Sequence, residues 1–250
     1  MAMWAAKRRF IYGGSVFLVL VLILGGVFWS LFYRAPTCSD GIQNGDETGV
    51  DCGGSCQLIC TSDALTPVVL WSKVFNISGD VYSAVAYVEN PNINSKNENA
   101  TYQFRIFDTD NKLITVRDGQ TSIPKGKKFA VFETGIILKN AKPKSADFKF
   151  MTFSKWQKDV TVEPEISLTY GTVVSASTTP NILGTITNKS IQDIPKVELV
   201  VFVFDDKQNT IGASRTYVEN LAKNTSQDFV FTWQKPFDIP ASVIDVIYHF

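Results

Sequence analysis

The residues best suited to chemistry are four cysteines near the start of the chain, Cys38, Cys52, Cys56 and Cys60. The segment around them is rich in glycine and poor in apolar residues, so it needs cross-links or a metal to hold a fold. The spacing lacks the paired C-x-x-C of zinc sites, and an even cysteine count favours two disulfides in an oxidising compartment. Four cysteines permit three pairings, and the spacing does not choose among them.

Side chains with hard oxygen ligands lie between these cysteines, at Asp40, Asn44, Asp46, Glu47 and Asp51. Carboxylate and amide oxygens are the ligands that calcium prefers, although the spacing is not that of an EF-hand loop. The alternative is that the Asp and Asn side chains cap turns in a solvated loop. The sequence thus leaves calcium open as a cofactor and indicates no other.

The order of residues in this segment also carries a resemblance. Cys38-x-Asp-Gly-x-x-Asn-Gly-x-Glu-Thr-x-x-Asp-Cys52-Gly-Gly-x-Cys56 resembles a short cysteine module of exported and surface proteins of microbes. The resemblance implies an extracytoplasmic setting and no particular activity.

Groups for catalysis are sparse elsewhere. The single histidine, His249, is one residue from the end of the chain, which makes a Ser-His-Asp or Cys-His site improbable. The P-loop, dinucleotide-binding and H-E-x-x-H patterns do not occur. The 24 basic and 24 acidic residues balance, so no strong field attracts nucleic acid. We therefore expect a protein that is not an enzyme and does not bind nucleic acid.

The location of the chain is predicted from an uncharged stretch, Phe10 to Tyr33. As a helix, this stretch is long enough to cross the hydrocarbon core of a membrane, which is about 30 Å thick. Lys7, Arg8 and Arg9 precede it, and only Arg34 follows closely, so the N-terminus should be cytoplasmic and the remainder extracytoplasmic. A cleaved signal peptide is the alternative. It is less favoured because the stretch is long and does not end in a small-x-small site.

The rest of the chain alternates β-rich stretches with turns and contains an internal repeat. Phe104-Arg-Ile-Phe-Asp108 matches Val201-Phe-Val-Phe-Asp205, and the sequence ending at Asn90 matches the one ending at Asn188, with a period near 100 residues. Strands are predicted at 67–76, 81–89, 101–108, 112–122, 128–137 and 146–153, and again at 165–175, 181–188, 196–205, 209–219, 226–233 and 242–250. This pattern predicts two tandem Ig-like β-sandwiches.

Alternation along the strands predicts which side chains are buried. Tyr102, Phe104 and Ile106 should face the first core, and Val197, Leu199, Val201 and Val203 the second. The opposite face of the latter strand carries Val200, Phe202 and Phe204, so it is apolar on both sides. Either another part of the chain covers this face, which we favour, or it is a partner surface.

The repeated unit carries a second resemblance. Phe104-x-Ile-Phe-Asp108, followed by a polar turn, a strand and Ile123-Pro-x-Gly126, resembles the FxLyD family of Ig-like extracytoplasmic domains. The second copy departs from it, because Val201 replaces the first Phe and Leu-Ala-Lys-Asn replaces the proline and glycine. Family members are mostly exported or anchored proteins, and the resemblance implies no catalytic residues.

Together these patterns predict an all-β protein with one transmembrane helix and a small disulfide-rich segment before two sandwiches. Because the connector is short, the sandwiches should sit end to end, with Trp156 at the joint.

The expected function is a membrane-anchored binding or scaffold protein with protein partners in the cell envelope. A calcium-dependent ligand-binding module and an exported enzyme with an unrecognised site are the alternatives. The predicted segments are a cytoplasmic N-terminus at 1–9, a lipid-embedded helix at 10–33, the cysteine module at 34–63, sandwiches at 64–155 and 165–250, and a connector at 156–164.

Overall fold

The computed structural model describes residues 2–32, 36–139 and 141–250, so Tyr33 and Arg34 at the predicted membrane exit lie outside the described residues. The chain divides into two compact units, Met1–Cys56 and Gln57–Phe250. The first contains the N-terminal helix and most of the cysteine module, and the second contains the β-sheets. Each unit is described by itself.

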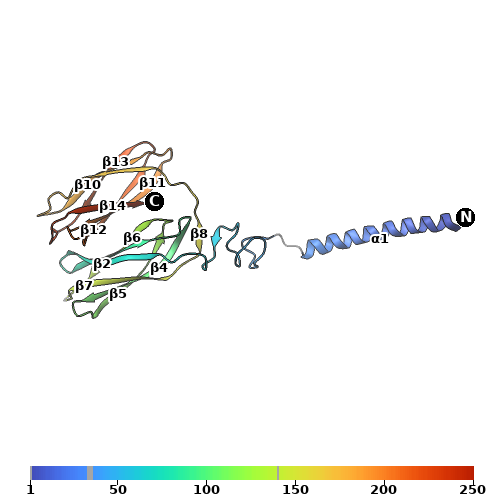
Figure 1. The fold of residues 1–250 in the computed structure, drawn as a ribbon, viewed down its shortest axis with the longest axis horizontal. Coiled ribbons are helices and arrows are strands. Elements are labelled where there is room, and N and C mark those ends of the chain that lie inside the picture. The colour runs from blue at the N-terminus through green and yellow to red at the C-terminus, as the bar shows by residue number, and fades with distance from the viewer. Residues whose placement is uncertain (1, 33–35, 140) are drawn as a thin grey trace. The chain divides into compact units, whose positions relative to one another are not determined.

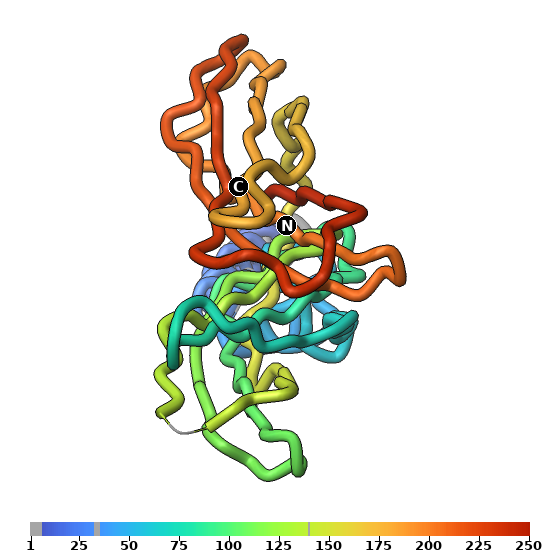
Figure 2. The backbone as a smooth tube through the Cα atoms, turned by 90° about the vertical axis from the view of Figure 1, so that its left-hand side faces the viewer, coloured from blue at the N-terminus to red at the C-terminus, as the bar shows by residue number. Residues whose placement is uncertain are grey.

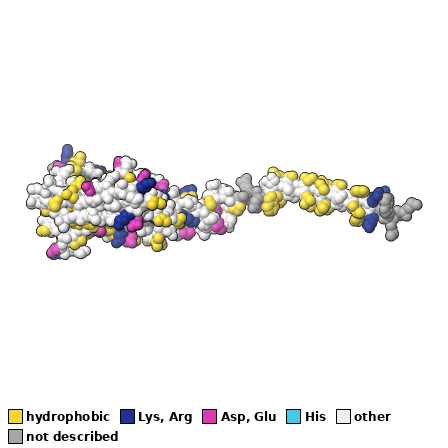
Figure 3. Space-filling model, turned by 90° about the horizontal axis from the view of Figure 1, so that it is seen from above, with side chains coloured by type: hydrophobic (Ala, Val, Ile, Leu, Met, Phe, Trp, Pro, Cys, Tyr) yellow, Lys and Arg dark blue, Asp and Glu magenta, His cyan; other side chains and the backbone are white. Residues whose placement is uncertain are grey.

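The N-terminal helix α1 spans Ala2–Phe32. Its part Lys7–Phe32 is long and apolar enough to cross a membrane, a criterion that a signal sequence near the N-terminus also meets. Apolar side chains cover the helix on the visible side, and basic side chains gather at its N-terminal end (Figure 3). A helix that is apolar all round needs either a protein interior or lipid around it. The side chains of residues 7–32 are all exposed rather than packed against protein.

The second unit is built from antiparallel strands (Figure 1). In the first half they are β1 (Leu58–Ile59), β2 (Val68–Ser78), β3 (Val81–Glu89), β4 (Ser95–Asp108), β5 (Leu113–Ile123), β6 (Lys128–Ile137), β7 (Pro143–Thr152) and β8 (Trp156–Lys158). In the second half they are β9 (Ile166–Tyr170), β10 (Asn181–Asn188), β11 (Ile194–Phe204), β12 (Thr210–Leu221), β13 (Ser226–Thr232) and β14 (Val243–His249).

Each half forms a sandwich of the same topology. The first packs the sheet β2-β3-β6 on a sheet in which β4 lies between β5 and β7, and the second packs β9-β10-β13 on β12-β11-β14. The predicted inward side chains fill the cores: Phe104 and Ile106 are fully buried in the first, and Leu199 and Val201 in the second. The prediction of two β-sandwiches after an N-terminal apolar helix is confirmed.

The repeat extends to buried hydrogen bonds. Asn90 and Asn188 hold equivalent positions, and each donates from its buried amide to backbone carbonyls of neighbouring loops. Asp108 and Asp205 likewise accept backbone N–H groups of the turn that follows them. A buried amide that satisfies several carbonyls costs little to bury, whereas its removal would leave those carbonyls unpaired. The sequence repeat is therefore also a repeat of loop geometry.

The two sandwiches pack face to face, not end to end as expected. The outer faces of β2-β3-β6 and β12-β11-β14 share a third apolar cluster that contains Val85, Tyr87, Val200 and Phe202. The second unit is thus a stack of four sheets, with the orange to red strands of the second sandwich beside the cyan to green strands of the first (Figures 1 and 2).

Candidate functional site

All four cysteines of the predicted module are oxidised. Cys38 and Cys56 form a disulfide with a Cα–Cα separation of 5.6 Å. Cys52 and Cys60 are disulfide-bonded as well. The disulfide prediction is confirmed, and one pairing that the sequence left open is now known. Because thiolates are the form of cysteine that binds metals, these cysteines are not available as metal ligands.

Two glycines of the module, Gly53 and Gly54, occupy positions where a side chain would clash. Gly54 has a φ of +49°, and a Cβ there would lie 2.0 Å from the carbonyl oxygen of Asp46. Gly53 has a φ of +81°, and its Cβ would lie 1.8 Å from Oγ1 of Thr48. The Gly-Gly pair therefore lets two loops approach each other closely between the cysteines. This explains why the module places these glycines next to Cys52.

The acidic side chains proposed as calcium ligands bind backbone N–H groups in the structure. Asp51 accepts from the N–H of Gly41 at 3.0 and 3.1 Å, and Asp40 accepts from Ile42 at 2.9 Å. The Asn44 amide donates to Asp40 at 2.9 Å and contributes most to lowering the pKa of Asp40 below 3.8. The contact of Asp40 with Ile42 is that of the turn-capping alternative, whereas Asp51 joins two parts of the module that are ten residues apart.

The arrangement of these ligands can be compared with a cation site. Among the described residues, the group that places three ligand atoms of His, Cys, Asp or Glu within 4.8 Å of one another consists of Cys38, Glu47 and Cys56. Its two sulfurs are bonded to each other, so it offers a single carboxylate. Asp46 is engaged by Ser55, whose hydroxyl donates to it at 2.8 Å. Calcium binding by Asp40, Asn44, Asp46, Glu47 and Asp51 stays a prediction that these contacts do not strengthen.

The apolar face of β11 that could have been a partner surface is covered from within the chain. Val200 and Phe202 are fully buried, and Phe204 packs partly buried against the same cluster. The ring of Phe202 lies 4.6 Å from that of Tyr87 and 5.0 Å from that of Trp71. The favoured alternative, cover by another part of the chain, is therefore confirmed, and the first sandwich provides that cover. The three residues are corrected from a partner surface to an internal interface between the sandwiches.

The complementary face on the first sandwich was not recognised from sequence. It lies on β3, where Val85 and Tyr87 point outward while Ala84, Ala86 and Val88 point into the first core. Burial raises the pKa of the Tyr87 hydroxyl to about 12. The signal was present in the sequence, because the five consecutive apolar residues at 84–88 are typical of a strand covered on both faces.

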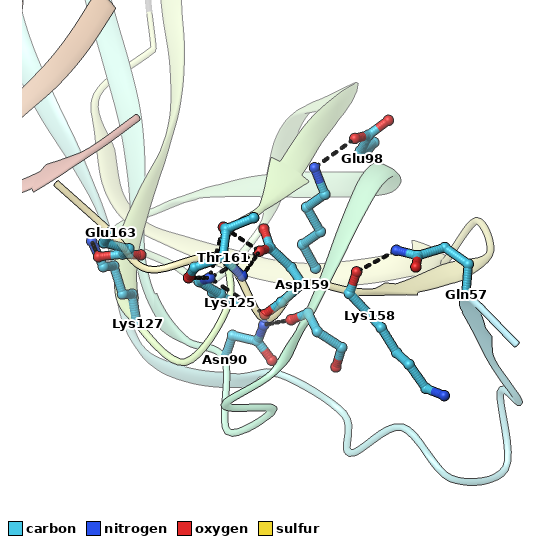
Figure 4. Close-up of polar contacts among 11 residues, drawn as sticks. Gln57, Asn90, Glu98, Lys125, Lys127, Lys158, Asp159, Thr161 and Glu163 are labelled. Atoms are coloured by element: carbon cyan, nitrogen blue, oxygen red, sulfur yellow. Dashed lines mark hydrogen bonds and ion pairs between the residues drawn. The ribbon is translucent and has the colours of Figure 1, made fainter. Parts of the chain in front are cut away.

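The connector is an ordered segment bound to the first sandwich, not a free linker (Figure 4). Strand β8 pairs with β1 and with the start of β4. Trp156 is buried in the core of the first sandwich, so its expected place at the joint is wrong. Lys125 binds the carboxylate of Asp159 at 2.9 Å and two atoms of Thr161, and Lys127 forms an ion pair with Glu163. These contacts fix where the second sandwich begins.

The only histidine of the chain forms a polar pair with Glu198 of β11. The Nε2 atom of His249 lies 2.7 Å from a carboxylate oxygen of Glu198, and Nδ1 is buried without a partner among the described residues. Burial raises the pKa of Glu198, but the interactions with His249, Arg215 and Tyr217 together outweigh it and the net shift is downward. Arg215 approaches the same carboxylate at 3.5 Å. The pair lies beside a polar cavity of about 100 Å³ that is too small for a substrate of ordinary size.

A wider cleft of about 440 Å³ opens where the two facing sheets diverge. One wall is formed by β2, β3 and β6 of the first sandwich, and the other by the start of β12 and the loop from Thr232 to Asp238. Its volume lies within the range of small-molecule sites. The sequence analysis did not predict this cleft, because its lining residues come from separate parts of both repeats.

A comparison of the sequence with protein-family models and with curated proteins finds no match. The resemblance to the FxLyD family and the Ig-like assignment therefore stay predictions. What is shown is a β-rich fold of sandwiched sheets, disulfide-bonded cysteines and one apolar helix near the N-terminus.

Proposed function

We propose that this chain is a single-pass membrane protein that presents its β-unit outside the cytoplasm as a binding or scaffold module of the cell envelope, without catalysis. The observation that carries the proposal is the set of oxidised cysteines that begins shortly after the apolar helix. Structural disulfides persist in oxidising compartments and are rare in the cytosol. Their presence supports export of everything from Cys38 onward.

The charges at the start of the chain support the orientation. Lys7, Arg8 and Arg9 lie at the N-terminal end of the apolar part of α1. Positive residues resist translocation, so this end would stay in the cytoplasm. Residues 10–33 would then contact lipid as an uncleaved anchor.

The β-unit supports a role in binding or scaffolding. Its two sandwiches share an apolar interface, and the connector is bonded to the first of them. Such a unit presents fixed loops at a defined geometry, which suits recognition of a partner. The similarity of the repeated motifs to Ig-like FxLyD domains agrees with this role, as does the similarity of the cysteine module to segments of exported proteins.

The proposal is tested with a full-length chain that carries one epitope tag before Met1 and another after Phe250. We expect protease added to intact cells, or to spheroplasts if an outer membrane is present, to remove the C-terminal tag and leave the N-terminal tag protected. A C-terminal tag that is digested only after lysis would overturn the proposed orientation. Loss of the N-terminal tag from the mature chain would show a cleaved signal sequence in place of an anchor.

A further inference from the structure

The cleft between the sandwiches is kept open by small side chains. The facing sheets are in contact through Phe202, Tyr87 and Trp71, but nearer the β2–β3 hairpin the cleft is lined by Ser83, Thr134 and Ala213. These short side chains cannot bridge the spacing of about 10 Å at which stacked sheets pack. A cavity therefore remains between two walls that the rest of the interface holds apart.

The outer wall of the cleft is a loop held close to β12 by a glycine. Trp233 and Phe237 of this loop pack edge to face with ring centroids 5.1 Å apart. A Cβ at Gly212 would lie 2.6 Å from the Phe237 ring, so the loop reaches this position only because residue 212 has no side chain. The indole N–H of Trp233 is buried without an acceptor among the described residues. Unpaired buried donors are uncommon in folded proteins, and this one lies against β12 at Gly212.

The lining of the cleft combines an aromatic surface with positive charge. Phe75 and Phe132 contribute rings from the first sandwich, and the Arg215 guanidinium lies 5.2 Å from the centre of the Phe132 ring. The Lys235 ammonium donates to the neutral amide oxygen of Asn76 at 2.6 Å, so this contact does not neutralise its charge. Arg215 and Lys235 are the cations among the lining residues and Asp238 is the anion; Glu198 pairs with Arg215 at 3.5 Å, so Lys235 is the cation whose charge is offered to a ligand.

We propose that this cleft binds a small anionic ligand with an aromatic or branched apolar body. The apolar body would lie against Phe75 and Phe132, and its carboxylate or similar group would accept a charge-assisted hydrogen bond from the Lys235 ammonium. The inference deepens the proposed function, because it rests on the β-unit being a binding module and names the site and class of ligand.

The test uses full-length protein in detergent and the soluble probe 6-fluoro-2-naphthoate, followed by fluorine NMR with an empty-micelle blank. The neutral 6-fluoro-2-naphthamide is the matched probe. We expect the naphthoate to bind about tenfold more tightly than the naphthamide, the factor expected for one charge-assisted hydrogen bond. Inorganic phosphate should compete only weakly, because it lacks the apolar body.

Three variants locate the site. Lys235→Gln should weaken naphthoate binding about tenfold and leave naphthamide binding unchanged. Lys223→Gln, at an exposed turn outside the cleft, should change neither. Thr134→Trp, at an exposed position on the cleft wall, should block both probes without disturbing the core.

Equal affinity for the two probes, an unchanged affinity in Lys235→Gln or in Thr134→Trp, or the absence of saturable binding would each overturn the proposal. Competition by inorganic phosphate as strong as that by naphthoate would overturn the apolar part of the ligand class. None of these outcomes affects the protease experiment on cells, so failure of the cleft and failure of the membrane topology are distinguishable.

Discussion

Replacement of Phe202 by alanine tests whether the four-sheet stack is one cooperative body. Phe202 is fully buried between the sandwiches, in contact with the rings of Trp71 and Tyr87. Phe-to-Ala changes in protein cores cost about 3–5 kcal/mol, which includes the cavity left behind. The aromatic contacts that are lost account for about 1–3 kcal/mol of this, at about 0.5–1.5 kcal/mol for each pair. We therefore expect the free energy of unfolding of Phe202→Ala to fall by about 4 kcal/mol.

The assay is urea unfolding of the full-length protein in detergent, monitored by tryptophan fluorescence. With a denaturant slope of about 3 kcal/mol/M, the urea concentration at the midpoint of unfolding should fall by about 1.3 M. Because Trp71 loses its neighbouring ring, its emission should also change before unfolding begins. Phe250→Ala makes the same chemical change at a side chain that is 45% exposed, and it should cost less than about 1 kcal/mol.

A loss below about 1 kcal/mol in Phe202→Ala, together with unchanged native fluorescence, would refute the interface. It would mean that the sandwiches are not in contact through this face in solution. In that case Val200, Phe202 and Phe204 would return as candidates for a partner surface, and the cleft would lose one of its walls.

Three further outcomes are expected from local features of the structure. Cys38→Ser opens a disulfide loop with a sequence separation of 18, which should lower the stability of the module by about 3 kcal/mol and raise its rate of proteolysis. Gly54→Ala should reduce the yield of correctly oxidised protein, measured by mass spectrometry after alkylation, whereas Gly41→Ala should reduce it much less, because a Cβ at position 41 meets nothing within 4 Å. Hydrogen bonds, chiefly from Thr161, lower the pKa of Asp159 from 3.8 to about 2, so its contribution to stability is complete above about pH 4 and is lost as the pH falls toward 2. The urea midpoint of Asp159→Asn should therefore lie below that of the wild type at pH 6 and approach it at pH 2.5, and a constant difference between the two would contradict this assignment.

The fold was largely predictable because its signals are local. Alternation of apolar residues placed Phe104, Ile106, Leu199 and Val201 in the correct cores, since side chains in a strand point to opposite faces in turn. The repeat predicted two domains of one topology, and the positive φ of Asn224 shows how the second copy replaces Gly126 in the equivalent turn. Asparagine tolerates this left-handed conformation better than other residues with a side chain.

The arrangement of the domains was not predictable in the same way. The two-faced pattern of β11 indicated that something covers Phe202, but only the outward residues of β3 show what does. The short connector led to the wrong expectation of an end-to-end arrangement, because its position depends on ion pairs with Lys125 and Lys127, which are distant in sequence. The cleft was missed for the same reason, since its walls come from both repeats.

The structure of the cysteine module was predictable only in part. Its composition predicted disulfides, because a short glycine-rich segment has too few apolar residues to fold without them. The partner of Cys38 could not be derived from spacing, and the oxygen-bearing side chains could not be divided between metal ligands and turn caps. Their hydrogen bonds with backbone N–H groups now provide a structural role for Asp40 and Asp51.

The most direct test of membrane display is the labelling of single added cysteines with a membrane-impermeant thiol reagent on intact cells or spheroplasts. The two variants are Ser177→Cys and Ala6→Cys. Position 177 is in an exposed loop of the β-unit, and position 6 comes before the basic residues that precede the apolar stretch. We expect the added thiol at position 177 to react without lysis and the one at position 6 to react only after lysis. The reverse pattern, or protection of both until lysis, would contradict the export of the β-unit.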